Sequence, residues 1–300
     1  MPLKSKQTPG AGEIFLDHVG WYVPNLNAVV SCFSRLGFVI TPFSVQGDRD
    51  PQTGEVVPQG SANRLVMLGS GYLEFLTVIE GADTPVSRHL QDRIDKYIGV
   101  HLVAFTVDDA EAEAKRIKLE GIDLQPTVNL RRRVEAEDGS NVEAAFSVIR
   151  AQFDLYPEGR VQTLTQHTPE YLWQDRYISL ENGIYALDEV IYAVPDPLDS
   201  ATRFAQFTGR SLTRSKIGAH IMLDRGKLIF ATAQSLRKLI GLEVLDGGPS
   251  IAAIGLLSKN LTKTAKFFHD QKIEHFVHEN NTLRIMPGGA LGTTLIISSN

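Results

Sequence analysis

Residues 16–25 read LDHVGWYVPN, and residues 187–196 read LDEVIYAVPD. Leu, Asp, Val and Pro recur in the two stretches at matching or adjacent offsets, and each apolar run ends in Pro followed by Asn or Asp. A short apolar run is typical of a buried strand, and Asn or Asp after it is a preferred first residue of a helix. The sequence therefore contains an internal repeat whose unit starts with a strand and continues into a helix.

Two more stretches follow the same plan, HLVAFTVDD at residues 101–109 and IAAIGLLSK at residues 251–259. Each of the four helical stretches is followed by short apolar or alternating segments separated by turn residues, which predicts about three strands. We interpret the chain as an α+β protein built from four βαβββ units. Their predicted spans are 14–81, 100–167, 184–233 and 250–298, with a connecting helix over 84–98 and a linker over 168–183.

Composition limits the class of protein. The 300 residues carry a net charge of −5 and are 43% hydrophobic, which is typical of a globular chain and not of a disordered one. The acidic balance argues against nucleic-acid binding, and the single cysteine, Cys32, excludes an internal disulfide. No apolar run is long enough for a membrane span, and the first residues resemble no signal peptide. We expect a cytoplasmic protein without membrane or nucleic-acid partners.

Several short motifs resemble the vicinal oxygen chelate superfamily, and within it the glyoxalase-like family that includes bleomycin resistance proteins and extradiol dioxygenases. They are Asp17-His18-Val19, residues 62–66 (ANRLV), residues 71–74 (GYLE) and the strand that starts at His101. The resemblance implies that paired units form curled sheets around a cleft that holds a metal. It predicts a flexible segment over 1–13, a domain with a metal site over 14–175 and a second, degenerate domain over 176–300.

The resemblance also implies a set of metal ligands. His18 takes the first-strand position of the first unit, Glu74 its last-strand position, and His101 the first-strand position of the second unit. Two imidazoles and one carboxylate suit a divalent ion of Fe, Ni, Zn, Mn or Co. In the second half of the chain, Glu189 and Ile229 stand at the positions of His18 and Glu74, so we expect no metal there.

The fourth ligand and the substrate-binding groups are less determined. Glyoxalase I places a second Glu on the last strand of the second unit, but residues 161–167 (VQTLTQH) contain no acid. Gln166 is the candidate fourth ligand, and His167 is the candidate acid–base group beside Glu74. An inward-facing arginine would bind a substrate carboxylate. In the run from Arg131 to Arg133, alternation selects either the middle arginine alone or the two outer ones; Arg133 and Arg64 are our candidates, and Arg150 is similar.

The resemblance implies a metal-dependent lyase or isomerase that acts on a small molecule chelated through adjacent oxygens. Two alternatives stay open. One is an extradiol-type ring-cleaving dioxygenase, because two histidines and one glutamate also form its iron site. The other is a non-catalytic protein that sequesters a drug or another small molecule in the same cleft. The expected partner is a small-molecule substrate, and a homodimer is compatible with the sequence.

Overall fold

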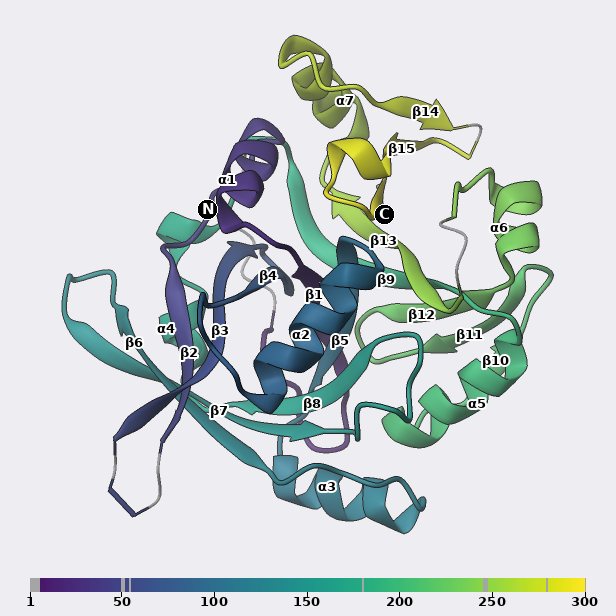
Figure 1. Cartoon of the computed structure of the whole chain (residues 1–300). Helices are drawn as coiled ribbons and strands as arrows, with labels where there is room; N and C mark the ends of the chain where they lie inside the picture. Colours follow the sequence, from purple (N-terminus) through teal and green to yellow (C-terminus); the bar gives the residue numbers. More distant parts are fainter. Residues whose placement is uncertain are drawn as a thin grey trace.

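The computed structural model describes residues 6–49, 52–53, 55–179, 181–244, 248–278 and 280–299 (Figure 1). The predicted α+β class and the four βαβββ units are confirmed. The elements of the first two units are β1 (Phe15–Tyr22), α1 (Leu26–Arg35), β2 (Ser44–Arg49), β3 (Val56–Met67), β4 (Tyr72–Val78), α2 (Pro85–Lys96), β5 (Gly99–Thr106), α3 (Ala110–Leu119), β6 (Val128–Glu135), β7 (Asn141–Arg150) and β8 (Arg160–Gln166).

A short linker with helix α4 (Pro169–Leu172) and the 3-10 turn η1 (Asp175–Tyr177) leads into the second half. The elements that follow are β9 (Ile184–Ala193), α5 (Pro197–Thr208), β10 (Leu212–Arg214), β11 (Gly218–Met222), β12 (Lys227–Ala231), α6 (Ala233–Ile240), β13 (Ser250–Ser258), α7 (Leu261–Asp270), β14 (Phe276–His278), β15 (Thr282–Ile285), η2 (Pro287–Gly289) and β16 (Thr294–Ser298). Within the described ranges, no helix is long and apolar enough to cross a membrane.

The repeat is set by a capping residue at the same place in each unit. Asn25, Asp109, Asp196 and Asn260 each follow the first strand, and each side chain accepts a hydrogen bond from a backbone N–H in the first turn of the next helix. Such a cap satisfies one of the free donors at a helix start. The sequence therefore fixes the strand-to-helix junction four times.

The first two units close into a barrel, whereas the last two form an open sheet. The barrel order is β1-β4-β3-β2-β6-β7-β8-β5, and the second sheet runs β10-β11-β12-β9-β13-β16-β15-β14. The pairing of β2 with β6 closes the barrel. In the second sheet, the edge strands β10 and β14 have only three residues each and do not meet.

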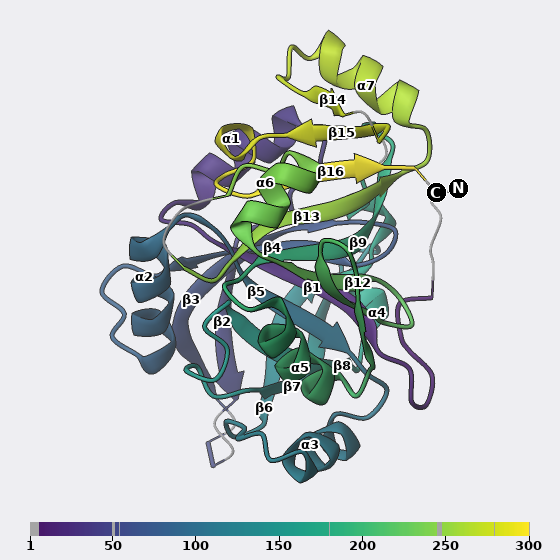
Figure 2. The ribbon, with the colours of Figure 1, turned by 90° about the vertical axis from the view of Figure 1, so that its right-hand side faces the viewer.

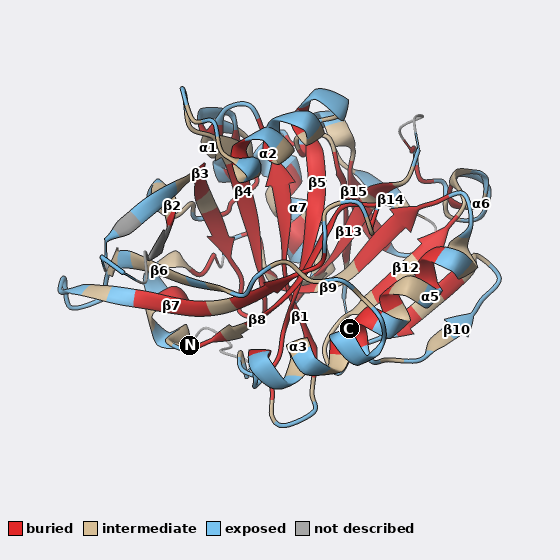
Figure 3. Ribbon diagram, turned by 60° about the horizontal axis from the view of Figure 1, so that its bottom comes forward, coloured by how far each residue is buried: buried red, intermediate tan, exposed pale blue. Residues whose placement is uncertain are grey.

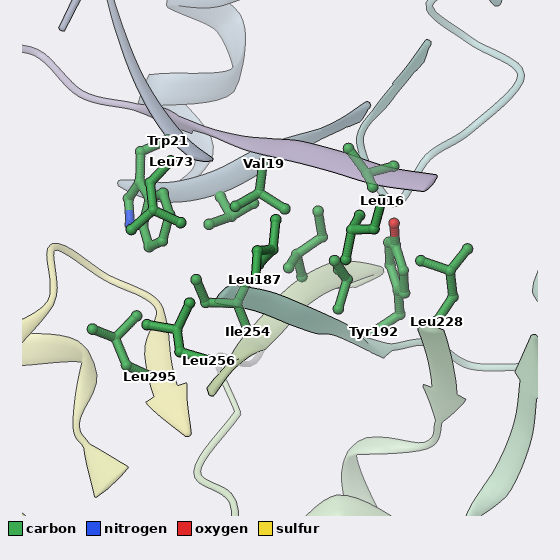
Figure 4. Packing of buried hydrophobic residues seen from close by; sticks show 14 of the residues in the cluster. Leu16, Val19, Trp21, Leu73, Leu187, Tyr192, Leu228, Ile254, Leu256 and Leu295 are labelled. Carbon is green, nitrogen blue, oxygen red and sulfur yellow. The ribbon is translucent and has the colours of Figure 1, made fainter. Parts of the chain in front are cut away.

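One hydrophobic core lies between the barrel and the second sheet (Figure 4). Leu16, Val19 and Trp21 of β1 face the side chains of the second sheet, among them Leu187 and Ile254. Helices α1 and α5 contribute to the same cluster. Figure 3 shows the resulting pattern, with buried strands through the middle and exposed faces on the outer helices. Because both halves share this core, the boundary between 175 and 176 stays a prediction.

The described part of the N-terminal segment contacts both halves. Residues 1–5 of the predicted flexible segment lie outside the described residues. The side chain of Gln7 donates to the carbonyl of Gly69 at 2.6 Å, and Arg225 donates to the carbonyl of Lys6 at 2.7 Å. Residues 6–13 are thus held against the fold by hydrogen bonds.

The inner face of the second sheet is covered by its own connecting helix. Leu236 of α6 packs with Ile191 and Ala193 of β9 and with Ala253 of β13. Figure 2 shows α6 lying across this sheet. On the matching face of the barrel, Leu90 and Ile94 of the connecting helix α2 join the buried cluster that contains Leu76 and Leu102, and a pocket lies inside the barrel next to this cluster.

Candidate functional site

The inward face of the barrel forms a pocket lined by apolar and polar side chains. Alternation along each strand sends every second side chain inward. The apolar lining consists of Leu65, Leu76, Leu102, Leu130, Phe146, Val148 and Leu164. The polar and charged lining includes His18, Gln46, Asn63, Tyr72, Glu74, Arg131, Arg132, Arg150, Arg160 and Gln162.

His18 is held by a bulge in β1. Leu16 pairs with Phe105 and His18 pairs with Ala104, so Asp17 is an extra residue on this strand. A bulge changes the direction of the side chains beside it. Here it brings the Asp17 carboxylate to 2.7 Å from Nδ1 of His18, while the His18 ring stacks on Tyr72 with centroids 4.4 Å apart. The carboxylate places the ring proton on Nδ1, which leaves the lone pair of Nε2 for the pocket.

Glu74 is oriented by two amides. Its Oε1 accepts from Nδ2 of Asn63 at 2.7 Å and from Nε2 of Gln46 at 3.0 Å. Gln46 is held in turn by Ser61, whose hydroxyl donates to its Oε1 at 2.7 Å. The other oxygen of Glu74, Oε2, lies 3.6 Å from Nε2 of His18, which is beyond a hydrogen bond. The two atoms are therefore close to each other without a hydrogen bond between them.

Tyr72 supplies a neutral hydroxyl beside this pair. Burial raises the pKa of Tyr72 well above its usual value, and the nearby carboxylates of Asp17 and Glu74 raise it further. The phenol stays protonated at neutral pH, so Tyr72 can donate a hydrogen bond in the pocket.

His101 does not join His18 and Glu74. Gly20 pairs with Leu102 and Trp21 pairs with Val100, so His101 is an extra residue in a bulge of β5. Its Nε2 lies 2.8 Å from the carbonyl oxygen of Tyr97, and its ring stacks on that tyrosine at 3.8 Å. Leu102 is the residue whose side chain lines the pocket. The geometry thus separates His101 from the other two predicted ligands.

The pH dependence of stability tests this placement of His101. Burial lowers the pKa of His101 from 6.5 to about 4. Between these values the unfolded chain binds the proton and the folded chain does not, so the free energy of unfolding falls as pH falls, by about 2 kcal/mol at pH 5 from this residue. We expect His101→Asn to lose less stability than the wild type between pH 7 and pH 5 in urea unfolding. An equal loss in both proteins would contradict the assignment.

Gln166 and His167 also lie away from the His18–Glu74 pair. The amide of Gln166 donates to both oxygens of Asp17 at 3.3 Å, so it positions Asp17. His167 is exposed, and its Nε2 lies 2.8 Å from the hydroxyl of Ser147. It does not line the pocket.

Of the predicted arginines, Arg150 lines the pocket, whereas Arg64 and Arg133 are not among its lining residues. Arg64 donates to the carbonyl of Thr41 at 2.9 Å, and Arg133 is exposed. Arg131 and Arg132 both line the pocket, and the guanidinium of Arg132 lies 5.6 Å from the ring of Phe146, so neither of the two open choices describes the lining. Arg150 and Arg160 of the β7–β8 wall line the pocket as well.

The pairing of strands shows which residues are equivalent in the two units. In the first unit, His18 pairs with Tyr72 and Gly20 pairs with Glu74. In the second unit, Leu102 pairs with Arg160 and Ala104 pairs with Gln162. The shared capping position makes Leu102 the equivalent of His18, and the parallel pairing then makes Gln162 the equivalent of Glu74. Sequence reasoning missed Gln162, Arg160 and Asp17 because only the register identifies them.

A divalent metal fits this set incompletely. His18 and Glu74 supply one imidazole and one carboxylate, but Leu102 has no donor atom and Gln162 supplies an amide oxygen at best. Within the described ranges, no group of three or more His, Cys, Asp or Glu side chains has the arrangement of a metal site. The residues therefore do not reproduce the predicted set of two histidines and one glutamate.

The second half carries no comparable site. Glu189, at the position of His18, forms an ion pair with Lys227, whose Nζ lies 3.0 Å from it. Ile229 stands at the position of Glu74 on β12. In the second half, the ion pair stands at the positions that His18 and Tyr72 hold in the barrel, and Leu236 of α6 packs on the same face of the sheet.

Comparisons with known proteins agree with this fold. A family model described as a glyoxalase-like domain matches residues 16–208. A hypothetical protein from Staphylococcus aureus is similar at a TM-score of 0.64 and 9% identity, over 96% of this chain and 100% of that chain. A mutant of 4-hydroxymandelate synthase from Streptomyces coelicolor is similar at a TM-score of 0.55 and 16% identity, over 96% of this chain and 92% of that chain.

A third structure is a fusion of a xylose isomerase-like TIM barrel with 4-hydroxyphenylpyruvate dioxygenase. It matches at a TM-score of 0.54 and 10% identity, over 98% of this chain and 50% of that chain. None of the curated proteins compared with the chain matches it. At these identities the solved structures show the fold and not the activity. The family match spans more than half of the chain and the fold agrees with it, so this chain belongs to the glyoxalase-like domain family.

Proposed function

We propose that the chain is a lyase- or isomerase-type enzyme that moves a proton next to a carbonyl group of a small molecule bound inside the barrel. One observation carries this proposal. Nε2 of His18 and Oε2 of Glu74 face each other at 3.6 Å in the pocket, and each is oriented from behind by a hydrogen bond to its other polar atom. Paired acid–base groups held in this way are typical of proton-transfer sites.

The roles follow from the hydrogen bonds. His18 keeps its Nδ1 proton for Asp17, so Nε2 acts as the base that removes the proton from carbon. The electrons of the C–H bond move to the carbonyl oxygen, and Tyr72 is placed to donate a hydrogen bond to the charge that develops there. The proton returns from His18 or Glu74 to the same carbon or to its neighbour. No atom is gained or lost, as an isomerase requires.

Metal-dependent chemistry is the second candidate. One observation favours it, because a carboxylate behind Nδ1 is the usual support of a metal-bound histidine. His18 and Glu74 would hold a divalent ion of Fe, Ni, Zn, Mn or Co, and the ion would polarise the carbonyl oxygen. Among the described residues that line the pocket, His18 is the one histidine, and the missing second imidazole favours the first candidate.

Metal removal separates the two candidates. The assay follows exchange of the protons next to the carbonyl of 2-oxobutanoate for solvent deuterium by proton NMR. We expect protein treated with a chelator to keep its exchange rate, and added divalent ions to raise it less than twofold. Loss of exchange on chelation and its recovery with one of the five metals would contradict the metal-free proposal and favour the second candidate.

A further inference from the structure

The β8 side of the pocket holds an arginine without a counter-charge. Arg160 is only 7% exposed, and it lines the pocket. Its Nε and Nη2 atoms are buried and have no hydrogen-bond partner in the part of the chain that the structure describes. Its guanidinium lies 5.4 Å from the ring of Phe153 and interacts with the Tyr22 hydroxyl, and neither of these neutral groups balances its charge.

Such an arrangement is costly in the free protein. A buried guanidinium loses its hydration, and an unpaired one recovers little of that energy from its surroundings. A planar donor fork matches a carboxylate, which accepts two parallel hydrogen bonds from it. The empty donor positions of Arg160 therefore indicate a ligand that carries this group.

The strand register places Arg160 relative to the proton-transfer pair. Ala104 pairs with His18 on one side and with Gln162 on the other, so β8 lies two strands from β1, about 10 Å between backbones. Arg160 and Gln162 are two residues apart and face the same way. Arg160, Gln162 and His18 line the same pocket, so a ligand bound by Arg160 shares the pocket with the proton-transfer pair.

The strip of β5 between β8 and β1 is apolar. Leu102 and Ala104 of β5 lie between them, and neither can bind a polar group. A ligand that lies along this strip between Arg160 and His18 has a carboxylate at one end and a short hydrocarbon body against β5.

We infer that the substrate is a short-chain carboxylate whose carboxyl group is bound by Arg160, with Gln162 beside it. This inference rests on the proposed function for the place of the reacting carbon. The bound carboxylate holds the molecule so that the carbon next to its carbonyl group faces His18. Arg160 is thus the residue that selects anionic over neutral substrates of the same length.

The first part of the test measures binding. Isothermal titration calorimetry is carried out with butanoate, 2-oxobutanoate and 2-oxopentanoate, and with the primary amides of the same acids. We expect the carboxylates to bind the wild type at least tenfold more tightly than the amides, and Arg160→Met to weaken carboxylate binding by about 10- to 100-fold. Arg160→Lys keeps the charge but loses the planar pair of donors. We expect its carboxylate affinity to lie between those of the wild type and Arg160→Met. The matched control is Arg133→Met, an exposed arginine on β6, which should bind like the wild type.

A stability measurement guards against a misfolded variant. Because Arg160→Met removes a buried unpaired charge, the melting temperature of the ligand-free variant should equal or exceed that of the wild type. Butanoate should raise the melting temperature of the wild type and leave that of Arg160→Met unchanged. Equal carboxylate affinity in wild type and Arg160→Met, equal affinity for acids and amides, or no binding of any of the three carboxylates overturns the inference.

Deuterium exchange distinguishes this inference from the proposed function. If the wild type binds 2-oxobutanoate through Arg160 but exchanges no proton, the proposed function fails and the carboxylate site stands. If Arg160→Met exchanges the protons of 2-oxobutanoate as fast as the wild type at low concentration, the carboxylate site fails and the proposed function stands.

Discussion

Replacing His18 with asparagine is expected to lower the deuterium exchange rate of a bound 2-oxo acid by about 10²- to 10⁴-fold, the usual contribution of a positioned general base. Asparagine can keep a polar contact with Asp17 in place of Nδ1, but it has no basic atom in place of Nε2. Binding of the 2-oxo acid should change little, because the carboxylate site lies on the other wall. The rate at saturation and the concentration at half-saturation, both measured by proton NMR, check the two parts of this prediction.

Two further variants make the experiment specific. Glu74→Gln removes the second group of the pair while its side-chain oxygen can still accept from Asn63, and we expect a loss of at least tenfold in the same rate. His167→Asn is the matched control, because His167 is an exposed histidine outside the pocket, and its rate should stay within twofold of the wild type. An unchanged rate in His18→Asn, or an equal loss in His167→Asn, would refute the assignment of His18 as the base.

Replacing Phe230 with alanine is expected to lower the free energy of unfolding by about 3–5 kcal/mol, as for other fully buried phenylalanines. Phe230 is 0% exposed, stacks on Tyr192 with centroids 4.8 Å apart, and lies 5.0 Å from Phe204 of α5. The chain has two tryptophans, and both, Trp21 and Trp173, lie in the first half. Because the two halves share one core, the transition seen by tryptophan fluorescence should shift even though Phe230 lies in the second half.

The control is Phe276→Ala, a phenylalanine of the same half that is 50% exposed on the edge strand β14. Its effect should stay within about 0.5 kcal/mol, as is usual for surface positions. Urea unfolding monitored by fluorescence and by circular dichroism measures both variants. A fluorescence transition that stays in place in Phe230→Ala, while part of the circular dichroism signal melts early, would show that the halves unfold independently.

Local signals in the sequence were sufficient for the architecture. The strand, the capping residue and the amphipathic helix recur four times, and each of these features acts within a few residues. Asn25 and Asp196 illustrate this, since each accepts a hydrogen bond from a residue two positions further on. The connecting helix α2 followed from the same local patterns.

The site was only partly predictable for a reason of register. Successive side chains of a strand point to opposite faces, so an error of one residue exchanges a pocket residue for an outward one. The apolar run around His101 contains a bulge that the sequence does not reveal, and Leu102 takes the inward position. Because the register of β8 cannot be obtained from the sequence, Arg160 and Gln162 were not predicted. Their pairing with β5 in the structure identified them.

The sequence by itself determined the four units, their helix starts and the presence of His18 and Glu74 on first and last strands, because these depend on hydrogen bonds and periodicities within short segments. Only the tertiary structure decided which polar residues share the pocket. It closed one pair of units into a barrel, covered the other with α6, and brought Asp17, His18, Glu74 and Arg160 together from three strands. Bulges and strand pairing decide which side chains face the pocket, and both arise from contacts between residues far apart in the chain.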